Sequence, residues 1–400
     1  MTSSVSEIVA SLDQITLDDV QGNDDDRHQI IAAARRLLNN LVKVPEQTYR
    51  MVFEEPNAFA SLMTCVDLGL FKTWTEFGGG EKSLDDLVGM CKYNCESNLL
   101  RRLLRLLVCM GYIQEIGEDR YGSTPFSLAL GEKNALVAES LYCRRHLLER
   151  ATMELPAFLA ANSYQEPVDS KETPYAFSDP EKRDFFTACV QNPMLQEAFS
   201  GFMTLWTKSK YPWPTYYDIE ALIQGADMSN APLIVDLGGH HGVDLGLVLD
   251  KHPSLPVGSL VLQDLPVVVE GAAVSLKSNN VFRIMGHDIF EPQPIVGARA
   301  YFAHAVFHDW PDNRAIEILT QTKAAMRKGY SKLLICDIAI PATGATSPQA
   351  TMDIGMMITL SGSERTEFAW KGLLAEAGFK IIKFWRDPMG YEALIEAELE

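Results

Sequence analysis

Residues 233–242 read LIVDLGGHHG, and this stretch decides the fold of the chain. An apolar run short enough for a buried strand leads into the acidic Asp236 and a glycine-rich turn, after which Val243 to Leu249 continues as a helix. Strand, glycine turn and helix in this order open a nucleotide-binding βαβ unit, in which the backbone of the turn comes close to a ligand. The turn has the pattern D-x-G-G-x-x-G and so differs from the dinucleotide fingerprint G-x-G-x-x-G.

A second acidic residue, Asp264, follows the next apolar strand, 259–263. A carboxylate at this place can accept hydrogen bonds from two ribose hydroxyls. The spacing of the two acids fits S-adenosylmethionine (SAM) at least as well as NAD. A glycine turn can also serve only to pack a helix on a sheet, but the rest of the chain favours a ligand.

The composition excludes several classes of protein. The formal net charge of −18 disfavours nucleic acid and anionic membranes as partners, because phosphate binding depends on lysine and arginine. No apolar run reaches the ~20 residues of a membrane span, and no signal peptide is expected. The seven cysteines are scattered, with no second pair beside Cys91 and Cys95. We therefore expect reduced thiols, no metal site and a cytoplasmic location.

The N-terminal part predicts a flexible acidic tail over 1–26 and a helical domain over 27–130. Residues 97–110 form a strongly amphipathic helix, and two short strands at 112–116 and 120–123 follow it. Helices followed by a two-stranded wing make a winged-helix arrangement.

A winged helix permits DNA binding, here with Arg101, Arg102 and Arg105 facing the phosphate backbone. The acidic chain and the leucines around these arginines favour a solvated helix edge instead. The helices before the wing are too apolar for a free surface, so a second subunit is the expected cover. We expect a homodimer formed through this domain.

Residues 131–225 are helical and rich in aromatic residues and methionine. The ordinary interpretation of such residues is a packed core. A region this apolar in front of a cofactor domain can also enclose a flat organic substrate.

From residue 226 to 400 the sequence alternates strand and helix, which predicts an open, mostly parallel sheet with helices on both faces. Ligands of such sheets bind at the carboxyl ends of the strands, where Asp236, Asp264, Asp288 and His308 all fall. The expected strands are 233–237, 259–263, 281–285, 299–304, 332–338, 379–385 and 391–396, with helices at 313–326 and 366–377.

Five motifs in order make the chain similar to the plant- and fungal-type small-molecule O-methyltransferases that use SAM. They are VDLGGHHG (235–242), QDLP (263–266), GHDIF (286–290), HDWPD (308–312) and SGSERT (361–366). The resemblance implies an α/β fold: a Rossmann-like SAM-dependent methyltransferase domain over 131–400, with a seven-stranded, mostly parallel sheet, behind an α-helical winged-helix dimerisation domain. The implied activity is transfer of a methyl group to a phenolic or enolic hydroxyl of a secondary metabolite.

The resemblance also implies roles for single residues. Gly238 lets the backbone approach the methionine part of SAM, Asp264 holds the ribose hydroxyls, Asp288 accepts from the adenine amino group, and Trp310 lies against the adenine face. The implied cofactor-binding set is Asp236, Gly238, Gly239, Asp264, Leu265, Asp288, Ile289, His304 and Trp310. The implied substrate contacts are Phe199, Met203 and Trp206, for an aromatic or polyketide-like small molecule.

His308 is the implied general base, because a phenol with a pKa near ~10 needs a positioned base with a pKa near ~7. Glu364 and Asp337 are implied to orient His308 and to stabilise its charged form. Plant members usually have glutamate at the second place, and the shorter Asp337 weakens the case that it reaches His308. A buried structural histidine is the alternative for His308.

The resemblance extends to a fungal branch of this fold, the SAM-dependent pericyclases, which keep the cofactor but transfer no methyl group. The shared motifs are VLQDLP (261–266) and PQP (292–294). Arginine is expected in that branch where this sequence has His308, so the histidine favours methyl transfer. The alternative is a pericyclase or dehydratase in which the sulfonium charge acts electrostatically. A winged-helix regulator that senses SAM is a third hypothesis, which the acidic charge disfavours.

Overall fold

The computed structural model describes residues 4–20, 22, 24–133, 136–275 and 282–400. They form two compact units. The first contains the residues up to Tyr142 together with Glu197–Trp206, and the second contains Cys143–Gln196 and Thr207–Glu400. This division differs from the expected boundary at residue 130, because part of the helical region 131–225 clusters with the N-terminal helices.

The first unit has the helices and the wing that the sequence predicts. The wing is an antiparallel sheet in the order β1-β3-β2, and the amphipathic helix α7 buries Leu100, Leu104 and Leu107. Its elements are α1 (Val5–Asp13), η1 (Asp18–Val20), α2 (Asp24–Leu41), α3 (Val44–Tyr49), η2 (Arg50–Glu54), α4 (Glu55–Asp67), α5 (Leu70–Glu76), β1 (Lys82–Ser83), α6 (Leu84–Met90), α7 (Ser97–Cys109), β2 (Gln114–Gly117), β3 (Arg120–Gly122) and α8 (Pro125–Ala129).

A helix, α1, lies inside the segment expected to be a flexible tail. Ser4 and Glu7 cap it reciprocally: the Ser4 N–H donates to Glu7 Oε2 at 2.7 Å, and the Glu7 N–H donates to Ser4 Oγ at 3.3 Å. Such a capping box satisfies backbone donors that a helix start leaves free. The helix buries no residue of its own.

The second unit contains a seven-stranded sheet in the order β6-β5-β4-β7-β8-β10-β9, which confirms the predicted fold class. Only β10 runs antiparallel to its neighbours. The strands are β4 (Ile234–Leu237), β5 (Leu260–Asp264), β6 (Phe282–Gly286), β7 (Ala300–His304), β8 (Lys332–Asp337), β9 (Phe379–Arg386) and β10 (Ala393–Leu399). Each coincides with a predicted strand to within three residues at either end.

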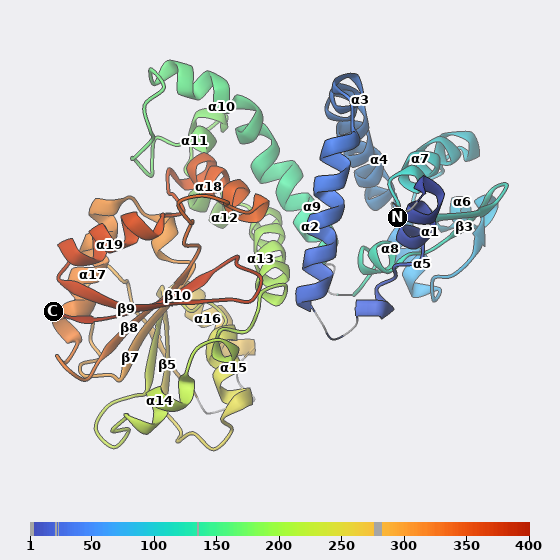
Figure 1. Ribbon diagram of the computed structural model, residues 1–400. Helices are drawn as coiled ribbons and strands as arrows, with labels where there is room; N and C mark the ends of the chain where they lie inside the picture. The colour runs from blue at the N-terminus through green and yellow to red at the C-terminus, as the bar shows by residue number, and fades with distance from the viewer. Residues whose placement is uncertain (1–3, 21, 23, 134–135, 276–281) are drawn as a thin grey trace. The chain divides into compact units, whose positions relative to one another are not determined.

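Helices cover both faces of this sheet (Figure 1). The α-helices of the second unit are α10 (Glu149–Ala161), α11 (Pro174–Ser178), α12 (Phe185–Gln191), α14 (Ile219–Gln224), α15 (Val243–Lys251), α16 (Pro266–Ser275), α17 (Asp312–Ala325), α18 (Ser347–Leu360) and α19 (Glu367–Glu376). The same unit has the π-helix η3 (Arg144–Leu148) and the 3-10 helices η4 (Trp213–Thr215) and η5 (Phe307–Asp309). Two more helices, α9 (Leu136–Cys143) and α13 (Pro193–Lys208), cross the division between the units.

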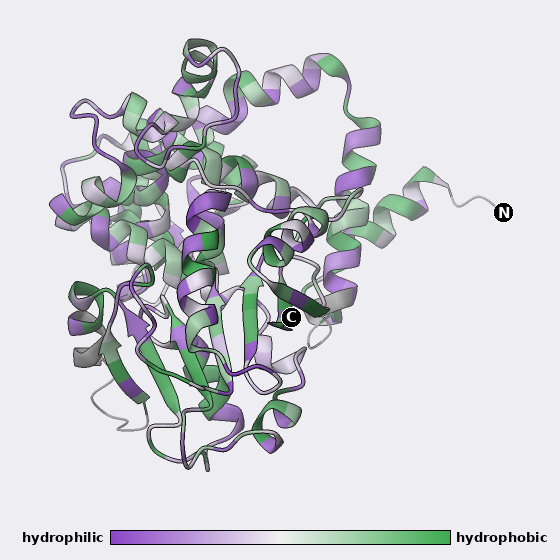
Figure 2. Ribbon diagram, turned by 90° about the vertical axis from the view of Figure 1, so that its left-hand side faces the viewer, coloured by the Kyte–Doolittle hydropathy of each residue, from purple (hydrophilic) through white to green (hydrophobic). Residues whose placement is uncertain are grey.

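Alternate residues of each strand enter different cores. Val235 and Leu237 of β4 pack with α17 and α19, whereas Ile234 packs with α14 and α15. The central parallel strands β4, β5 and β7 are almost continuously apolar (Figure 2), as a parallel sheet covered on both faces requires. The edge strand β9 is more polar and more exposed. Among the described helices, none is long and apolar enough to cross a membrane.

Candidate active site

The turn after β4 has no room for a side chain at Gly238 or Gly239. Gly238 and Gly242 have positive φ angles of 75° and 72°, and a Cβ on Gly239 would lie 2.3 Å from Oδ2 of Asp236. The N–H groups of Gly238 and Gly239 both donate to the Gln263 carbonyl oxygen, at 2.9 and 3.0 Å. The turn therefore lies tightly against the end of β5.

Asp236 is buried beneath this turn. Neither of its carboxyl oxygens has a hydrogen-bond partner within the described part of the chain. Burial raises the pKa of Asp236 well above its ordinary value, and the neighbouring Asp244 adds to this effect. A buried polar group without a partner is costly, so this carboxyl group is available to a ligand donor.

Asp264 closes β5 beside the turn, as predicted. Its Oδ2 accepts from the His240 N–H at 2.9 Å and its Oδ1 accepts from the Leu265 N–H at 2.7 Å. Two backbone donors fix the carboxylate, and each oxygen keeps a second lone pair for a hydroxyl donor. Leu265 itself is exposed.

The next strand end carries the residues predicted to surround an adenine ring. Asp288 is exposed after β6, and its Oδ1 accepts from the Phe290 N–H at 3.0 Å. The Trp310 ring meets the Phe290 ring edge to face at 4.8 Å between centroids. Ile289, Phe290 and Trp310 are partly buried against the same hydrophobic core, so β6 and η5 contribute to one wall.

His308 lies on η5, and its backbone is held from the segment that follows α18. Arg365 donates to the Phe307 carbonyl oxygen and to the Trp310 carbonyl oxygen, both at 2.7 Å. The Ser363 N–H donates to the His308 carbonyl oxygen at 3.1 Å, and a Cβ on Gly362 would lie 2.2 Å from that oxygen. The motif SGSERT therefore fixes the position of His308 through the backbone.

Glu364 meets the His308 ring directly, as predicted. Nδ1 of His308 lies 2.8 Å from Oε1 of Glu364, whose side chain is fully buried. Because a carboxylate only accepts, Nδ1 carries a proton and Nε2 faces the other way. This orientation leaves Nε2 as the ring atom that can exchange a proton with a bound molecule.

Asp309 is a neighbour of His308 that the sequence did not reveal, with Oδ1 3.4 Å from Nε2. Burial opposes a charge on the ring, but Glu364 and Asp309 together outweigh it and raise the pKa of His308 to about 10. For the carboxyl group of Asp309, burial has the opposite effect and raises its pKa to about 6. At neutral pH the ring is therefore charged, which differs from the pKa near ~7 expected of a general base.

Asp337 ends β8 and is buried, but the predicted contact with His308 is not formed as a hydrogen bond. Neither of its carboxyl oxygens has a hydrogen-bond partner among the described residues. Burial raises the pKa of Asp337 to about 7, although the charge of His308 lowers it. The charge of Asp337 still contributes to the raised pKa of His308.

His304, predicted to contact the cofactor, has both ring nitrogens engaged by carboxylates. Nδ1 lies 3.0 Å from Asp244 Oδ2, and Nε2 lies 3.3 Å from Glu392 Oε2. Lys210 joins the group, with Nζ 2.5 Å from Glu392 Oε1. Lys210 and Glu392 carried no motif in the sequence; the antiparallel β10 brings Glu392 to this edge.

The predicted substrate residues lie on α13 in the first unit. Phe199, Met203 and Trp206 are all half-buried. Of the other aromatic residues in 131–225, Phe158, Tyr175 and Phe185 are buried, and Tyr175 and Phe185 meet edge to face. These three belong to a packed core.

Comparison with known proteins gives the family. A sequence profile of O-methyltransferase domains matches residues 215–380. The chain is 44% identical over 400 residues to O-methyltransferase ATR12 of Stachybotrys chlorohalonatus, with 100% of both chains covered. It is 33% identical to O-methyltransferase mfmE of Annulohypoxylon moriforme, over 100% of this chain and 96% of that protein.

Three solved structures are similar over nearly the whole chain. LepI in complex with SAM has a TM-score of 0.88 at 26% identity, covering 99% of this chain and 100% of that one. OxaC in complex with SAH and oxaline has a TM-score of 0.78 at 26% identity, covering 99% and 98%. A structure described as a pericyclic reaction enzyme has a TM-score of 0.86 at 26% identity, covering 99% and 100%. The chain belongs to the O-methyltransferase family, which uses SAM as its cofactor.

Proposed function

We propose that this chain is a SAM-dependent O-methyltransferase that acts on a phenolic or enolic hydroxyl of a secondary metabolite, with His308 as the general base. The observation that carries the proposal is the 2.8 Å contact between His308 Nδ1 and the buried Glu364. It directs Nε2 away from Glu364 and toward the side of Asp309, at the carboxyl edge of the sheet where the glycine turn and Asp264 also lie.

The residues of this edge fit SAM. Because Gly238 and Gly239 carry no side chain, a ligand can approach the backbone of this turn closely. The carboxyl group of Asp236 has no hydrogen-bond partner among the described residues and can accept a hydrogen bond from a ligand. Asp264 would take the ribose hydroxyls and Asp288 the adenine amino group. When bound, SAM supplies a methyl group on a positively charged sulfur, which makes the carbon electrophilic.

His308 would remove the hydroxyl proton of the acceptor at Nε2. A ring with a pKa of about 10 and a phenol with a pKa of ~10 hold the proton almost equally well. Glu364 stabilises the charged ring that results. Because the free ring is mostly charged at pH 7, we expect turnover to rise with pH until His308 is neutral.

The second candidate is a SAM-binding pericyclase or dehydratase. The pKa of His308 favours it, because a charged ring donates a hydrogen bond and cannot accept a proton. The high structural similarity to the structure described as a pericyclic reaction enzyme supports the same alternative. Under this hypothesis the product forms without S-adenosylhomocysteine, and a SAM analogue that cannot transfer its methyl group still supports turnover.

We also propose a homodimer, a small aromatic or polyketide-like acceptor, and a cytoplasmic location. Exposed apolar residues on α2, among them Ile30, Leu37 and Leu41, support a subunit interface in the first unit. Phe199, Met203 and Trp206 are the proposed acceptor contacts. All seven cysteines are described and free, which supports a reducing compartment.

The test of the activity is His308→Ala, assayed with labelled SAM and a panel of phenolic and polyketide-like acceptors. We expect loss of label transfer while the dissociation constant for S-adenosylhomocysteine, measured by calorimetry, stays unchanged. Loss of cofactor binding together with activity would assign His308 a structural role.

A further inference from the structure

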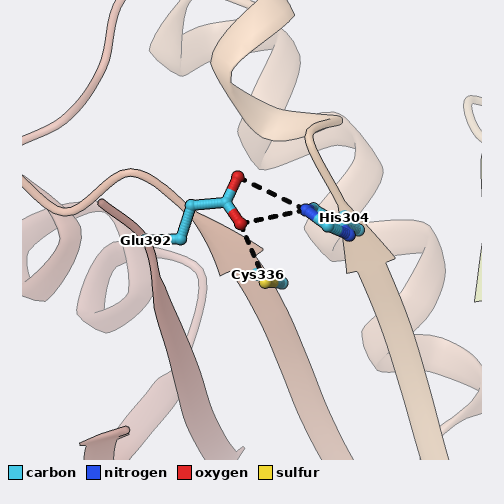
Figure 3. A group of neighbouring side chains, drawn as sticks. All are labelled: His304, Cys336 and Glu392. Carbon is cyan, nitrogen blue, oxygen red and sulfur yellow. Dashed lines mark hydrogen bonds and ion pairs between the residues drawn. The ribbon is translucent and has the colours of Figure 1, made fainter. Parts of the chain in front are cut away.

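Three potential metal ligands meet at the carboxyl edge of the sheet, in the second unit. His304 ends β7, Cys336 lies opposite it on β8 in register, and Glu392 directly precedes β10. Their ligand atoms, the imidazole nitrogen, the thiol sulfur and a carboxylate oxygen, all lie within 4.8 Å of one another. Figure 3 shows the three side chains converging on one point.

Asp244 lies behind His304 in the way that a carboxylate lies behind a metal-binding histidine. Asp244 Oδ2 lies 3.0 Å from Nδ1 of His304, so Nδ1 donates there and Nε2 is turned toward Cys336 and Glu392. A carboxylate behind a histidine is the usual device that orients a metal-binding imidazole. Thiolate, imidazole and carboxylate together form a donor set that suits Zn²⁺ and similar borderline ions.

A protein cation already lies among these donors. Nζ of Lys210 is 2.5 Å from Glu392 Oε1 and 3.2 Å from His304 Nε2. All three side chains are nearly buried, with exposed fractions of 9% for Lys210, 7% for Glu392 and 11% for His304. The ammonium group therefore neutralises the carboxylate at the point that a metal ion would occupy.

We propose that His304, Cys336 and Glu392 form a site for a thiophilic divalent ion such as Zn²⁺, and that Lys210 closes this site unless the ion displaces it. On binding, the ion forms bonds to Nε2, Sγ and a carboxylate oxygen. The ion pair between Lys210 and Glu392 breaks. The proton that His304 Nε2 directs at Glu392 and the thiol proton of Cys336 both pass to solvent, because metal ligands are deprotonated. Three protein ligands leave a fourth position for water. The inference is independent of the proposed methyl transfer.

The sequence predicted no metal site, because no two of these ligands share a short motif. Only the pairing of β7, β8 and β10 brings them together. Zinc sites read from sequence depend on two closely spaced pairs of cysteine or histidine. Here His304 and His308 are four residues apart, but no such pair lies around Cys336 or Glu392 to complete a motif.

The test uses Co²⁺ as a coloured substitute for Zn²⁺, added to the full chain with Cys109→Ser, which removes an exposed thiol. We expect a thiolate-to-cobalt charge-transfer band that Zn²⁺ abolishes. Cys336→Ser on the same background should remove the band. Lys210→Met should tighten Co²⁺ binding at least about tenfold, because Glu392 loses its resident cation.

Circular dichroism of each variant confirms that it is folded. If Lys210→Met does not fold, the comparison of the Cys109→Ser protein with and without Cys336→Ser decides alone. The proposal fails if no band forms at saturating Co²⁺, if the band survives in Cys336→Ser, or if a folded Lys210→Met protein binds no more tightly than its parent.

Discussion

Replacing Glu364 by glutamine keeps the shape of this side chain and removes its charge. In the wild type the pKa of His308 is raised from 6.5 to about 10. The difference, 10 − 6.5 = 3.5, corresponds to a preference for the charged ring of up to about 5 kcal/mol. Glu364 supplies the largest part of the attraction that overcomes burial, so in Glu364→Gln we expect the pKa of His308 to fall toward its ordinary value.

Turnover should nevertheless fall, because the position of the ring proton is lost. A glutamine amide can donate to Nδ1 as well as accept from it, so the ring can hold its proton on Nε2, the tautomer that cannot act as a base there. A positioned general base contributes about 10²- to 10⁴-fold to a rate. We expect kcat with a phenolic acceptor to fall by about 10²- to 10⁴-fold in Glu364→Gln, while binding of S-adenosylhomocysteine is unchanged. The matched control is Glu317→Gln, a partly exposed glutamate of α17 that pairs with Arg314.

The pH dependence of stability gives a readout that needs no acceptor. A raised histidine pKa in the folded state adds stability that is complete below pH 6.5 and is lost as the pH rises through about 10. The free energy of unfolding of wild type should exceed that of Glu364→Gln most clearly near pH 6, and the difference should shrink toward pH 10. Denaturant unfolding and NMR titration of the His308 ring measure both effects. An unchanged pKa of His308 together with wild-type turnover would refute the role given to Glu364.

Three further changes test the surroundings of the site. Asp337→Asn should raise the free energy of unfolding at pH 8 by up to about 4 kcal/mol, because burial raises the pKa of Asp337 from 3.8 to about 7. Below pH 3.8 the carboxyl group is neutral in both the folded and the unfolded chain, so the gain should disappear there. An equal gain at pH 3.5 would contradict this explanation. Gly239→Ala should weaken binding of S-adenosylhomocysteine at least about tenfold in calorimetry, because the new Cβ collides with Asp236. Its control is Gly246→Ala in α15, where nothing lies within 4 Å of the new atom; equal affinities in the two variants would rule the collision out. Arg365→Met should lower the free energy of unfolding by about 3 kcal/mol in a urea titration, because two backbone carbonyl groups lose a charged donor; an unchanged midpoint would show that this donor is dispensable.

Much of the fold follows from short-range patterns in the sequence. The apolar runs that end in Asp236 and Asp264 predict strands, because a buried parallel strand is apolar on both faces. The turn between them is recognisable by Gly238 and Gly239, where no side chain fits. His308 and Glu364 were found through motifs, and the structure brings them into contact at 2.8 Å.

The electrostatic environment of the site did not follow from the sequence. Asp309 directly follows His308 in the chain, yet only the η5 turn places its carboxylate 3.4 Å from Nε2. Lys210 and Glu392 lie in segments without motifs. The sheet order brings Glu392 to His304, and the segment after α13 brings Lys210 to the same place. The charge of the His308 ring depends on how many buried acids surround it, and this number is set by tertiary packing.

The central claim is that His308 removes a proton so that an acceptor oxygen can be methylated. The most direct measurement is the ratio of S-adenosylhomocysteine to product when the wild-type chain turns over one acceptor with SAM. The account predicts one S-adenosylhomocysteine for each methylated product, and neither compound above background in His308→Gln. Product that accumulates without S-adenosylhomocysteine would contradict methyl transfer and assign the charged ring of His308 to the pericyclase alternative.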